Sequence, residues 1–305
     1  MKTALADRVI VVTGAANGIG NATALALAAE GAALVLVDID ADGLGALRRV
    51  FVGDGFRASV VRADVRDSPA LEALVRHAVA AFGRVDAVVN CAGIVIPGAI
   101  DTCPADDIAR QLDTNLGGTI NVTRAFVPQF RRQGAGHLVL IASLAGLVPL
   151  PGESIYAASK FAVRGFAHSI AHELRGTGVA VTVVCPDSTR TRMLEIEAAD
   201  PGSSLSFSSP AMDPEEVARG ILGALKAPRL EVTVPALRGR LIRWLGAMPA
   251  LFGWMYPLLD ASSRRRKARY WDALQRRRGR SGCVGRPVAA FGASERQDVR
   301  CEKAR

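Results

Sequence analysis

Short apolar segments that alternate with helix-forming stretches dominate the first 235 residues of the chain. Strands that are apolar on both faces are typical of a parallel sheet covered by helices on each side. The alternation therefore predicts a doubly wound, Rossmann-like α/β fold with about seven strands. The expected strands cover residues 8–13, 33–38, 58–62, 85–90, 137–142, 179–185 and 230–234, and the expected helices cover residues 19–30, 69–82, 105–133, 154–175 and 214–226.

Three regions of different composition divide the chain. Residues 1–235 hold the predicted α/β domain, in which the Ser-, Asp- and Pro-rich residues 187–212 are expected to form a lid loop. Residues 236–263 are an apolar C-terminal segment. Residues 264–305 are a basic tail, which we expect to be partly helical to residue 280 and disordered from Ser281 onward.

Positive charge is confined to the tail. Residues 264–305 contain 14 of the 38 lysines and arginines but 4 of the 29 acidic residues, so they carry a net charge of +10 and the remainder carries −1. A neutral body is not built for nucleic acid, and we predict no such partner. Half of the residues are hydrophobic, which excludes a disordered chain. The five cysteines lack the paired spacing of a metal or redox motif, so we predict no metal.

The sequence predicts neither a secretory nor a membrane-spanning segment. The N-terminal apolar run is short and has the character of a first strand, not of a signal peptide. No stretch of about 20 apolar residues occurs. We therefore expect a cytoplasmic protein, with peripheral attachment to the inner face of a membrane as an open alternative.

A glycine-rich turn follows the first predicted strand. Gly14, Gly18 and Gly20 permit a tight turn, in which backbone N–H groups at the start of the next helix approach a bound pyrophosphate. Glycines also serve ordinary turns, but dinucleotide binding requires this position between a strand and a helix. The predicted cofactor contacts in this turn are Thr13, Gly14, Asn17, Gly18, Ile19 and Gly20.

Asp38 ends the second predicted strand, 18 residues after Gly20. A carboxylate there accepts hydrogen bonds from the ribose hydroxyls of adenosine and repels a 2′-phosphate. No arginine adjoins Asp38 in the sequence to neutralise it, and Asp40 adds negative charge. We therefore predict NAD in preference to NADP; the alternative is an acid in an ordinary turn.

Tyr156 and Lys160 are four residues apart in a predicted helix, so they share one helix face. Tyrosine is a poor base at neutral pH because its ordinary pKa is about 10. A nearby ammonium favours the phenolate, so we expect Lys160 to lower the pKa of Tyr156. The alternative for the pair alone is a surface tyrosine stacked on a lysine stem.

Together with the glycine turn, this pair gives the chain a resemblance to the short-chain dehydrogenases/reductases over residues 6–234. The family's TGxxxGxG turn matches residues 13–20, and its YxxxK motif matches residues 156–160. The resemblance implies a catalytic tetrad of Asn115, Ser143, Tyr156 and Lys160. It also implies cofactor contacts at Asp64, Val65, Asn90, Ala92, Gly93, Tyr156, Lys160, Pro186 and Thr191.

Two positions depart from the family pattern. Cys91 replaces the second asparagine of the NNAG turn, and Asp187 replaces the glycine that usually follows the proline after the sixth strand. Asp187 is expected near the nicotinamide, where it alters the lid. Thr189 rivals Thr191 as the threonine that contacts the carboxamide.

The resemblance implies hydride transfer between NAD(H) and a secondary alcohol or ketone. Tyr156 is expected to exchange a proton with the substrate oxygen, Ser143 to orient that oxygen, and Lys160 to hold the nicotinamide ribose and tune Tyr156. Asn115 is expected to hold a water molecule that connects Lys160 to solvent. An NADPH-dependent biosynthetic ketoreductase and a non-catalytic NAD-binding sensor are the alternatives.

The segments expected around the substrate are apolar. They are residues 94–96, residues 147–151, and Met193 with Leu194 at the start of the lid. We therefore favour a lipophilic substrate of steroid, retinoid or other lipid type. Arg190 and Arg192 in the lid leave an anionic substrate open.

The C-terminal segment and the long helices predict further contacts. Residues 244–259 carry no charge and contain Trp244, Trp254 and Tyr256, residue types that favour membrane interfaces. With the basic residues that follow, they predict peripheral contact with an anionic membrane. The alternative is that they cover the substrate cleft or a subunit interface. The helices predicted at residues 105–133 and 154–175 suggest a homodimer or homotetramer, by resemblance to the family.

Overall fold

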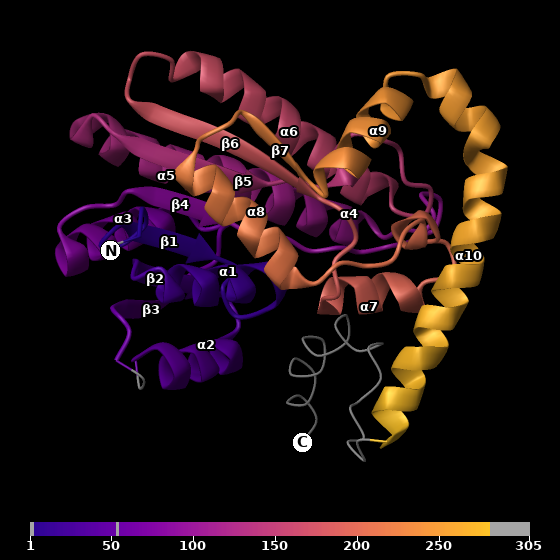
Figure 1. The fold of residues 1–305 in the computed structure, drawn as a ribbon, viewed down its shortest axis with the longest axis horizontal. Coiled ribbons are helices and arrows are strands. Elements are labelled where there is room, and N and C mark those ends of the chain that lie inside the picture. Colours follow the sequence, from indigo (N-terminus) through magenta and orange to yellow (C-terminus); the bar gives the residue numbers. More distant parts are fainter. Residues whose placement is uncertain (1–2, 53–54, 281–305) are drawn as a thin grey trace, which may run out of the picture.

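The computed structural model describes residues 3–52 and 55–280. Within them the strands form one parallel sheet in the order β3-β2-β1-β4-β5-β6-β7 (Figure 1), which confirms the predicted fold class. The strand order reverses at β1, and folds of this type bind ligands at the carboxyl ends of the strands beside that point. The strands are β1 (Val9–Thr13), β2 (Ala33–Asp38), β3 (Ala58–Arg62), β4 (Ala87–Asn90), β5 (Gly136–Ile141), β6 (Val179–Pro186) and β7 (Glu231–Val234).

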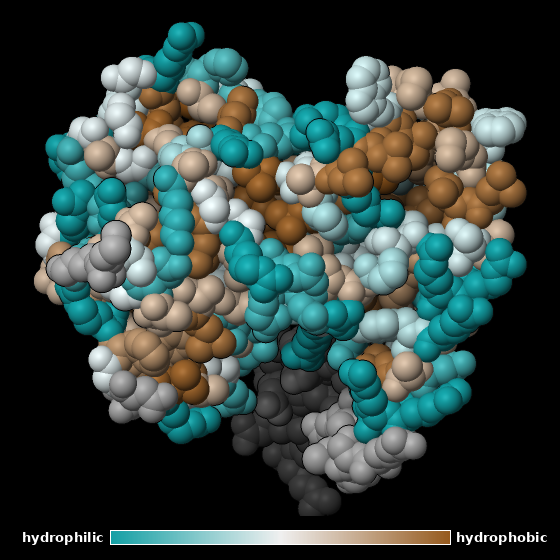
Figure 2. Space-filling view, in the orientation of Figure 1, coloured by the Kyte–Doolittle hydropathy of each residue, from teal (hydrophilic) through white to brown (hydrophobic). Residues whose placement is uncertain are grey.

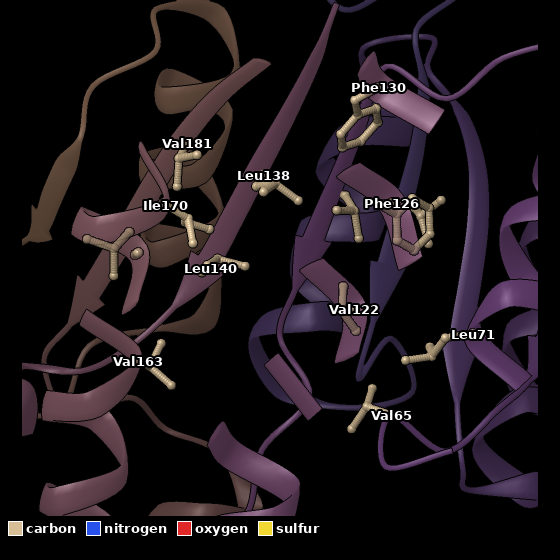
Figure 3. Close-up of a cluster of buried hydrophobic side chains, with 14 of the residues drawn as sticks. Val65, Leu71, Val122, Phe126, Phe130, Leu138, Leu140, Val163, Ile170 and Val181 are labelled. Atoms are coloured by element: carbon tan, nitrogen blue, oxygen red, sulfur yellow. The ribbon is translucent and has the colours of Figure 1, made fainter. Parts of the chain in front are cut away.

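Helices cover both faces of the sheet, and the strands within it, such as β1, β2 and β4, are apolar and buried on both sides. In β1, Ile10 and Val12 join one buried cluster, whereas Val11 joins the other. The first cluster packs against α1 (Gly18–Ala29), α2 (Ala41–Leu47) and α8 (Pro214–Lys226). The second packs against α3 (Ser68–Phe82), α5 (Gly118–Gln133) and α6 (Ser154–Glu173), where Figure 3 shows Phe126 and Phe130 of α5 between Leu71 and Leu138.

The prediction of one continuous helix over residues 105–133 is wrong. It consists of α4 (Ala105–Leu112), a π turn at Asp113–Gly117 and α5. A π turn holds an extra residue and re-aims the side chains within it. Asn115 lies in this turn, where its side chain is buried and bonded to the loop after β4.

The lid predicted as a loop over residues 187–212 contains α7 (Arg192–Ala199) and a 3₁₀ turn at Leu205–Phe207. Leu194, Ala198 and Phe207 form a buried cluster there, against which Tyr270 and Trp271 pack. Tertiary packing of this kind stabilises short helices whose own periodicity is weak. The partner residues stand far along the chain, so local sequence does not reveal α7.

The C-terminal segment forms a helical hairpin of α9 (Ala236–Gly246) and α10 (Pro249–Arg280) beside the α/β body (Figure 1). A proline inside a helix removes a backbone hydrogen bond and usually kinks or breaks the helix. Pro249 instead begins α10, where its missing N–H is not needed, and Pro257 lies within the helix. Packing of Phe252, Tyr256 and Leu259 against the body holds the helix around Pro257.

Helix α10 also crosses the boundary predicted at residue 264 between the apolar segment and the basic tail. No helix in residues 3–52 and 55–280 combines the length and hydropathy needed to cross a bilayer. The disorder predicted from Ser281 onward falls outside the described residues.

Candidate active site

The glycine turn lies at the carboxyl end of β1, between α1 and the neighbouring strand β4. Gly14 and Gly18 have φ angles of +62° and +53°, which residues with side chains rarely adopt. A Cβ atom on Gly20 would lie 2.0 Å from the carbonyl oxygen of Gly14, so glycine alone fits there. Asn17 precedes α1 without a side-chain capping bond, so no side chain caps the first N–H groups of the helix against an incoming anion.

Asp38 reaches from the end of β2 to this turn. Its carboxylate accepts hydrogen bonds from the N–H groups of Ala16 at 2.9 Å and Asp40 at 3.0 Å. Arg62 pairs with Asp38 across β2 and β3, and its guanidinium donates to the carbonyl oxygen of Ile39. No arginine adjoins Asp38 in the sequence, but strand pairing places Arg62 beside it in the folded protein.

Thr13 and Asn90 support the turn from within the protein. The Thr13 hydroxyl donates to Asn90 Oδ1 at 2.6 Å, and the Asn90 amide donates to the Thr119 hydroxyl of α5 at 3.0 Å. The Ala92 N–H donates to the Thr13 hydroxyl at 3.3 Å. The side chains of Thr13 and Asn90 are buried, so they hold β1, β4 and α5 together and do not face the crevice.

Asp64 and Val65, predicted to meet the adenine, have side chains with partners inside the protein. The Asp64 carboxylate accepts hydrogen bonds from Arg66 Nε at 2.9 Å and Nη2 at 2.6 Å, and this pair holds the pKa of Asp64 below its ordinary value. Val65 is buried against Gly118, the first residue of α5. Their backbone groups are thus the parts left to contact a cofactor.

Ser143, Tyr156 and Lys160 converge beside the glycine turn. Ser143 follows β5, and a hydrogen bond joins its hydroxyl to the Tyr156 phenol. Lys160 Nζ donates to the carbonyl oxygen of Ile141 at 3.1 Å and lies 5.5 Å from the centre of the Tyr156 ring. A Cβ atom on Gly93 would lie 3.5 Å from this ammonium, so the turn after β4 passes directly over it.

Burial controls the protonation of this group. Burial raises the pKa of Tyr156, the carboxyl groups of Glu197 and Glu153 raise it further, and the hydrogen bond with Ser143 opposes them. Burial also lowers the pKa of Lys160 to about 8. Desolvation by burial is the largest of these influences, so the net pKa of Tyr156 is raised, and the lowering expected from Lys160 stays a prediction. Tyr156 is a neutral phenol at pH 7, the form that donates a proton.

Asn115 connects the loop after β4 to α6. Its Oδ1 accepts a hydrogen bond from the Ile94 N–H at 2.8 Å, and its Nδ2 donates to the Ile94 carbonyl at 2.9 Å. Nδ2 also donates to the Ser159 hydroxyl, next to Lys160, at 3.0 Å. The tetrad thus comes together in space, while the water-holding role of Asn115 stays a prediction.

A cavity of about 380 Å³ opens beside the tetrad, with Ser143, Tyr156 and Lys160 in its wall. A Cβ atom on Gly18 would lie 2.9 Å from the Thr191 methyl group, so Thr191 lies against the glycine turn. The hydroxyls of both threonines donate to backbone carbonyls, Thr189 to Asp187 and Thr191 to Thr189, so the choice between them stays a prediction. The apolar part of the wall comprises Ile19, Ile141, Leu144, Ala145, Val148, Leu150, Pro186, Met193, Leu194, Leu205, Leu241, Ile242, Trp244, Leu245, Met248, Leu251, Phe252, Met255 and Leu259.

The C-terminal hairpin completes this cavity, since α9 and α10 supply much of its apolar wall. Asp187 forms an ion pair with Arg238 of α9 and accepts a hydrogen bond from the Ser209 hydroxyl at 2.9 Å. The residue that departs from the family pattern therefore fastens the hairpin to the end of β6. The hairpin lines the cavity, as one of the two alternatives for residues 244–259 requires.

Two buried acids near the site, Glu153 and Glu197, are absent from the sequence-based predictions. Glu153 directly precedes α6, and Glu197 lies on α7 and lines the cavity. In the sequence, Glu197 stands in a polar stretch that indicates a solvated loop. No local pattern distinguishes it from an exposed acid, because its burial depends on contacts with distant segments.

Comparison with known proteins identifies the family. The model for short chain dehydrogenases matches residues 8–201. The chain therefore belongs to the short-chain dehydrogenase/reductase family, a family of oxidoreductases, as the glycine turn and the tyrosine–lysine motif indicated.

Individual relatives extend the similarity beyond the motifs. The oxidoreductase UcpA of Salmonella typhimurium is 35% identical over 227 residues, which cover 74% of this chain and 83% of UcpA. Glycine betaine reductase ATRR of Emericella nidulans is 36% identical over 231 residues, and the chain spans only 18% of its length. A solved short chain dehydrogenase/reductase from Burkholderia phymatum, in complex with NAD, has a TM-score of 0.73 at 28% identity, covering 78% of this chain and 92% of that one.

Proposed function

We propose that the protein is an NAD(H)-dependent oxidoreductase that interconverts a lipophilic secondary alcohol and its ketone. The observation that carries the proposal is one cavity whose wall combines Ser143, Tyr156 and Lys160 with mainly apolar side chains, beside the glycine turn. A catalytic group at one end and an apolar wall elsewhere suit a hydrophobic substrate with a single reacting oxygen.

The residues at the ends of β1 and β2 fit a dinucleotide. Gly14 and Gly20 bring the backbone close to the uncapped start of α1, as a pyrophosphate requires. Asp38 is positioned by two backbone N–H groups with its carboxylate partly exposed, as a ribose diol requires. When bound, NADH supplies the hydride.

Three side chains then serve the substrate. Tyr156, held as a neutral phenol, donates its proton to the carbonyl oxygen as the alcohol forms. Ser143 accepts a hydrogen bond from the Ala145 N–H at 3.1 Å, which fixes its hydroxyl beside the Tyr156 phenol, where it orients the substrate oxygen. Lys160, anchored on the Ile141 carbonyl, is placed to hold a ribose hydroxyl.

The choice of NAD over NADP rests on Asp38, whose carboxylate repels a 2′-phosphate. Arg62 lies on the neighbouring strand and supplies a cation of the kind that attracts that phosphate. The position of Arg62 therefore favours an NADPH-dependent ketoreductase as the second candidate. A non-catalytic NAD sensor is disfavoured by the assembled tetrad.

The test is a screen of long-chain and cyclic ketones with NADH and with NADPH. The loss of absorbance of the reduced cofactor measures turnover. We expect turnover with NADH and hydrophobic ketones. Binding of NADH without turnover on any hydrophobic alcohol or ketone would support the sensor, and lower KM for NADPH would support the second candidate.

We further propose that the hairpin attaches peripherally to an anionic membrane, from which the lipophilic substrate enters the cavity. Trp244 and Trp254 are 71% and 74% exposed, and Trp244 also lines the cavity. Figure 2 shows brown side chains gathered over α9 and the start of α10, with teal ones along the rest of α10. Exposed arginines on that later part, such as Arg265 and Arg269, suit anionic headgroups.

Liposome flotation tests this attachment. The full chain is mixed with vesicles of phosphatidylglycerol and phosphatidylcholine at low and at high salt. We expect flotation at low salt, and loss of it in the double variant Trp244→Gln, Trp254→Gln. The double variant Phe56→Gln, Ile100→Gln, which removes exposed apolar side chains from the body, is the matched control. A wild-type chain that stays with the soluble fraction at low salt would exclude the attachment.

We also propose that the protein is a homodimer or homotetramer that pairs through α5 and α6. Light scattering at micromolar concentration tests this state. A mass of one chain would exclude it, and a mass of two or four chains is expected.

A further inference from the structure

Two carboxyl groups that the proposed reaction does not use are buried at the substrate cavity. Glu153 is 2% exposed and directly precedes α6, the helix that carries Tyr156. Glu197 of α7 is 7% exposed and lines the cavity itself. Acidic side chains are rarely buried in this way unless they have partners or a function.

The partners of this pair come from the lid and from α10. The Ser206 hydroxyl donates to Glu153 Oε1 at 3.1 Å and is also hydrogen-bonded to Glu197. Glu153 Oε2 is buried with no hydrogen-bond partner among the described residues. Lys267 of α10 lies beside both carboxyls, with its ammonium donating to the carbonyl oxygens of Ser203, at 3.0 Å, and of Asp200.

One buried ammonium thus faces two buried carboxyls, and the pair keeps a proton. Burial raises the pKa of Glu153 to about 7, and burial together with the Glu153 charge raises the pKa of Glu197 well above its ordinary value. Lys267 opposes both shifts without cancelling them. The shift favours the protonated form of Glu197, which has an O–H group to donate as well as oxygens to accept.

We propose that Glu197 is a polar anchor for a second oxygen of the lipophilic substrate, a hydroxyl or a carbonyl remote from the carbon that reacts at Tyr156. The inference rests on the proposed function and adds the class of substrate, a hydrophobic ketone with one further neutral oxygen. Met193, Leu194 and Leu205 line the same cavity as Glu197, together with its buried partner Ser206. A single buried hydrogen-bonding group in apolar surroundings discriminates strongly between ligands that do and do not pair with it.

The nearest other charged groups in the wall do not serve this purpose. Asp187 and Arg238 also line the cavity, but they form an ion pair with each other. Lys160 is committed to the Ile141 carbonyl and the catalytic group. A substrate carboxylate is disfavoured at this end, since its charge would meet Glu153 and Glu197, and the ammonium beside them, Lys267, already bonds the Ser203 and Asp200 carbonyls.

The experiment compares 2-decanone with 2-decanones that carry one hydroxyl at carbon 5 to carbon 10, assayed by NADH oxidation. We expect wild type to favour at least one hydroxyketone by about tenfold or more in kcat/KM. Glu197→Leu should abolish this ratio, whereas Glu197→Gln, which keeps the shape and both hydrogen-bonding functions, should retain most of it. Glu195→Gln on the same helix, where Glu195 faces Arg278, is the control and should match wild type.

Equal kcat/KM for the parent and every hydroxyketone in wild type would overturn the anchor, as would an unchanged ratio in Glu197→Leu. A folding defect in that variant is detected by its melting temperature, and Glu197→Gln then decides. Trp244 in the cavity wall offers a readout that needs no turnover, because its fluorescence reports ligand binding.

Titration with 1-decanol and with decanediols separates this inference from the proposed function. Tighter binding of a diol in wild type but not in Glu197→Leu supports the anchor even where no ketone is reduced. Equal binding of alcohol and diols in wild type overturns it, even where ketones are reduced.

Discussion

The α/β body and the C-terminal hairpin are held in place by different forces. The body is built around fully buried side chains on both faces of the sheet, such as Phe126 on one face and Leu27 on the other, each 0% exposed. The hairpin is fastened by small apolar clusters, around Phe252 and Tyr270, and by ion pairs at the surface, including Arg243 with Glu231 and Arg278 with Glu195, each at 2.6 Å. The hairpin also leaves large apolar side chains exposed, such as Leu237 at 73% and Trp254 at 74%.

In the proposed function, the body supplies the chemistry and the hairpin supplies the selectivity. The body fixes Tyr156 and Lys160 by dense packing, which a proton transfer requires. The hairpin closes the cavity with a wall that can differ between relatives without disturbing the sheet. Substitutions in the two regions should therefore have effects of different kind and size.

The largest expected contrast is in turnover. Tyr156→Phe removes the proton donor of the body and should lower kcat by roughly 10²–10⁴-fold while NADH binding persists. Tyr256→Phe makes the same change in the hairpin, where the ring packs in an apolar cluster, and should leave kcat near wild type. Steady-state kinetics and NADH fluorescence measure both effects. Near-wild-type kcat in Tyr156→Phe would refute the assigned donor.

Stability should show the same contrast. Phe126→Ala opens a cavity in a fully buried cluster and should lower the free energy of unfolding by about 3–5 kcal/mol. Trp254→Ala, an aromatic truncation on the exposed face of the hairpin, should change it by less than about 0.5 kcal/mol. Urea denaturation distinguishes the two. A large loss in Trp254→Ala would mean that its face is covered in solution.

Glu153 and Glu197, the buried acids beside Lys267 of α10, should make the free energy of unfolding depend on pH. The folded protein holds the Glu153 proton up to about pH 7, whereas the unfolded chain releases it near 4.5. The folded state thus binds more protons in that window, so stability falls as pH rises from 4.5 to 7. The pKa of Glu197 is also raised, so its proton acts in the same sense, while Asp200 and Lys267 are the other charges facing the pair.

Glu153→Gln should flatten this dependence, with a difference from wild type on the order of 2 kcal/mol between pH 5 and pH 7. Lys160 acts in the opposite sense at higher pH: its pKa of about 8 in the folded state makes stability rise between pH 8 and 10.5. Thermal melts across pH 5–10 test both signs. A wild-type melting temperature that rises between pH 5 and pH 7 relative to Glu153→Gln would contradict the assignment.

The smallest expected effect is in cofactor preference, which depends on the body alone. Asp38→Ala should weaken NADH and reduce repulsion of the 2′-phosphate, shifting the KM ratio toward NADPH by about tenfold. Adding Arg62→Ala should reverse part of that shift, because Arg62 lies alongside on β3. Removal of the hairpin cations, as in Arg269→Ala, should leave the ratio unchanged. A ratio unaffected by Asp38→Ala would place the adenosine ribose elsewhere.

Much of the body could be predicted because its determinants are local. An apolar run, such as residues 33–38, indicates each strand. Tyr156 and Lys160 are recognisable from their spacing on one helix. The π turn at Asn115 could not be predicted, because the helical periodicity of residues 105–133 continues on both sides of it. The role of the turn is seen in the folded protein, where it lets the Asn115 side chain bond to Ile94 and Ser159.

The rest depends on contacts between distant segments. Helix α7 packs against Tyr270 and Trp271, and Arg62 reaches Asp38 only through strand pairing. The burial of Glu153 and Glu197 likewise depends on Lys267, more than 60 residues further along the chain. Sequence patterns describe one element at a time, so they miss groups that three elements bury together.

The ion pair between Asp187 and Arg238 has a consequence for how such a hairpin is inherited. A glycine at the end of β6, as is usual in the family, gives Arg238 no counter-charge, and a chain that keeps Asp187 but loses α9 has an acid without this cation in the wall of its cavity. Neither Asp187 nor Arg238 can form this ion pair without the other. A chimera that moves α9 and α10 onto a relative would therefore have to carry position 187 with them, as one heritable unit.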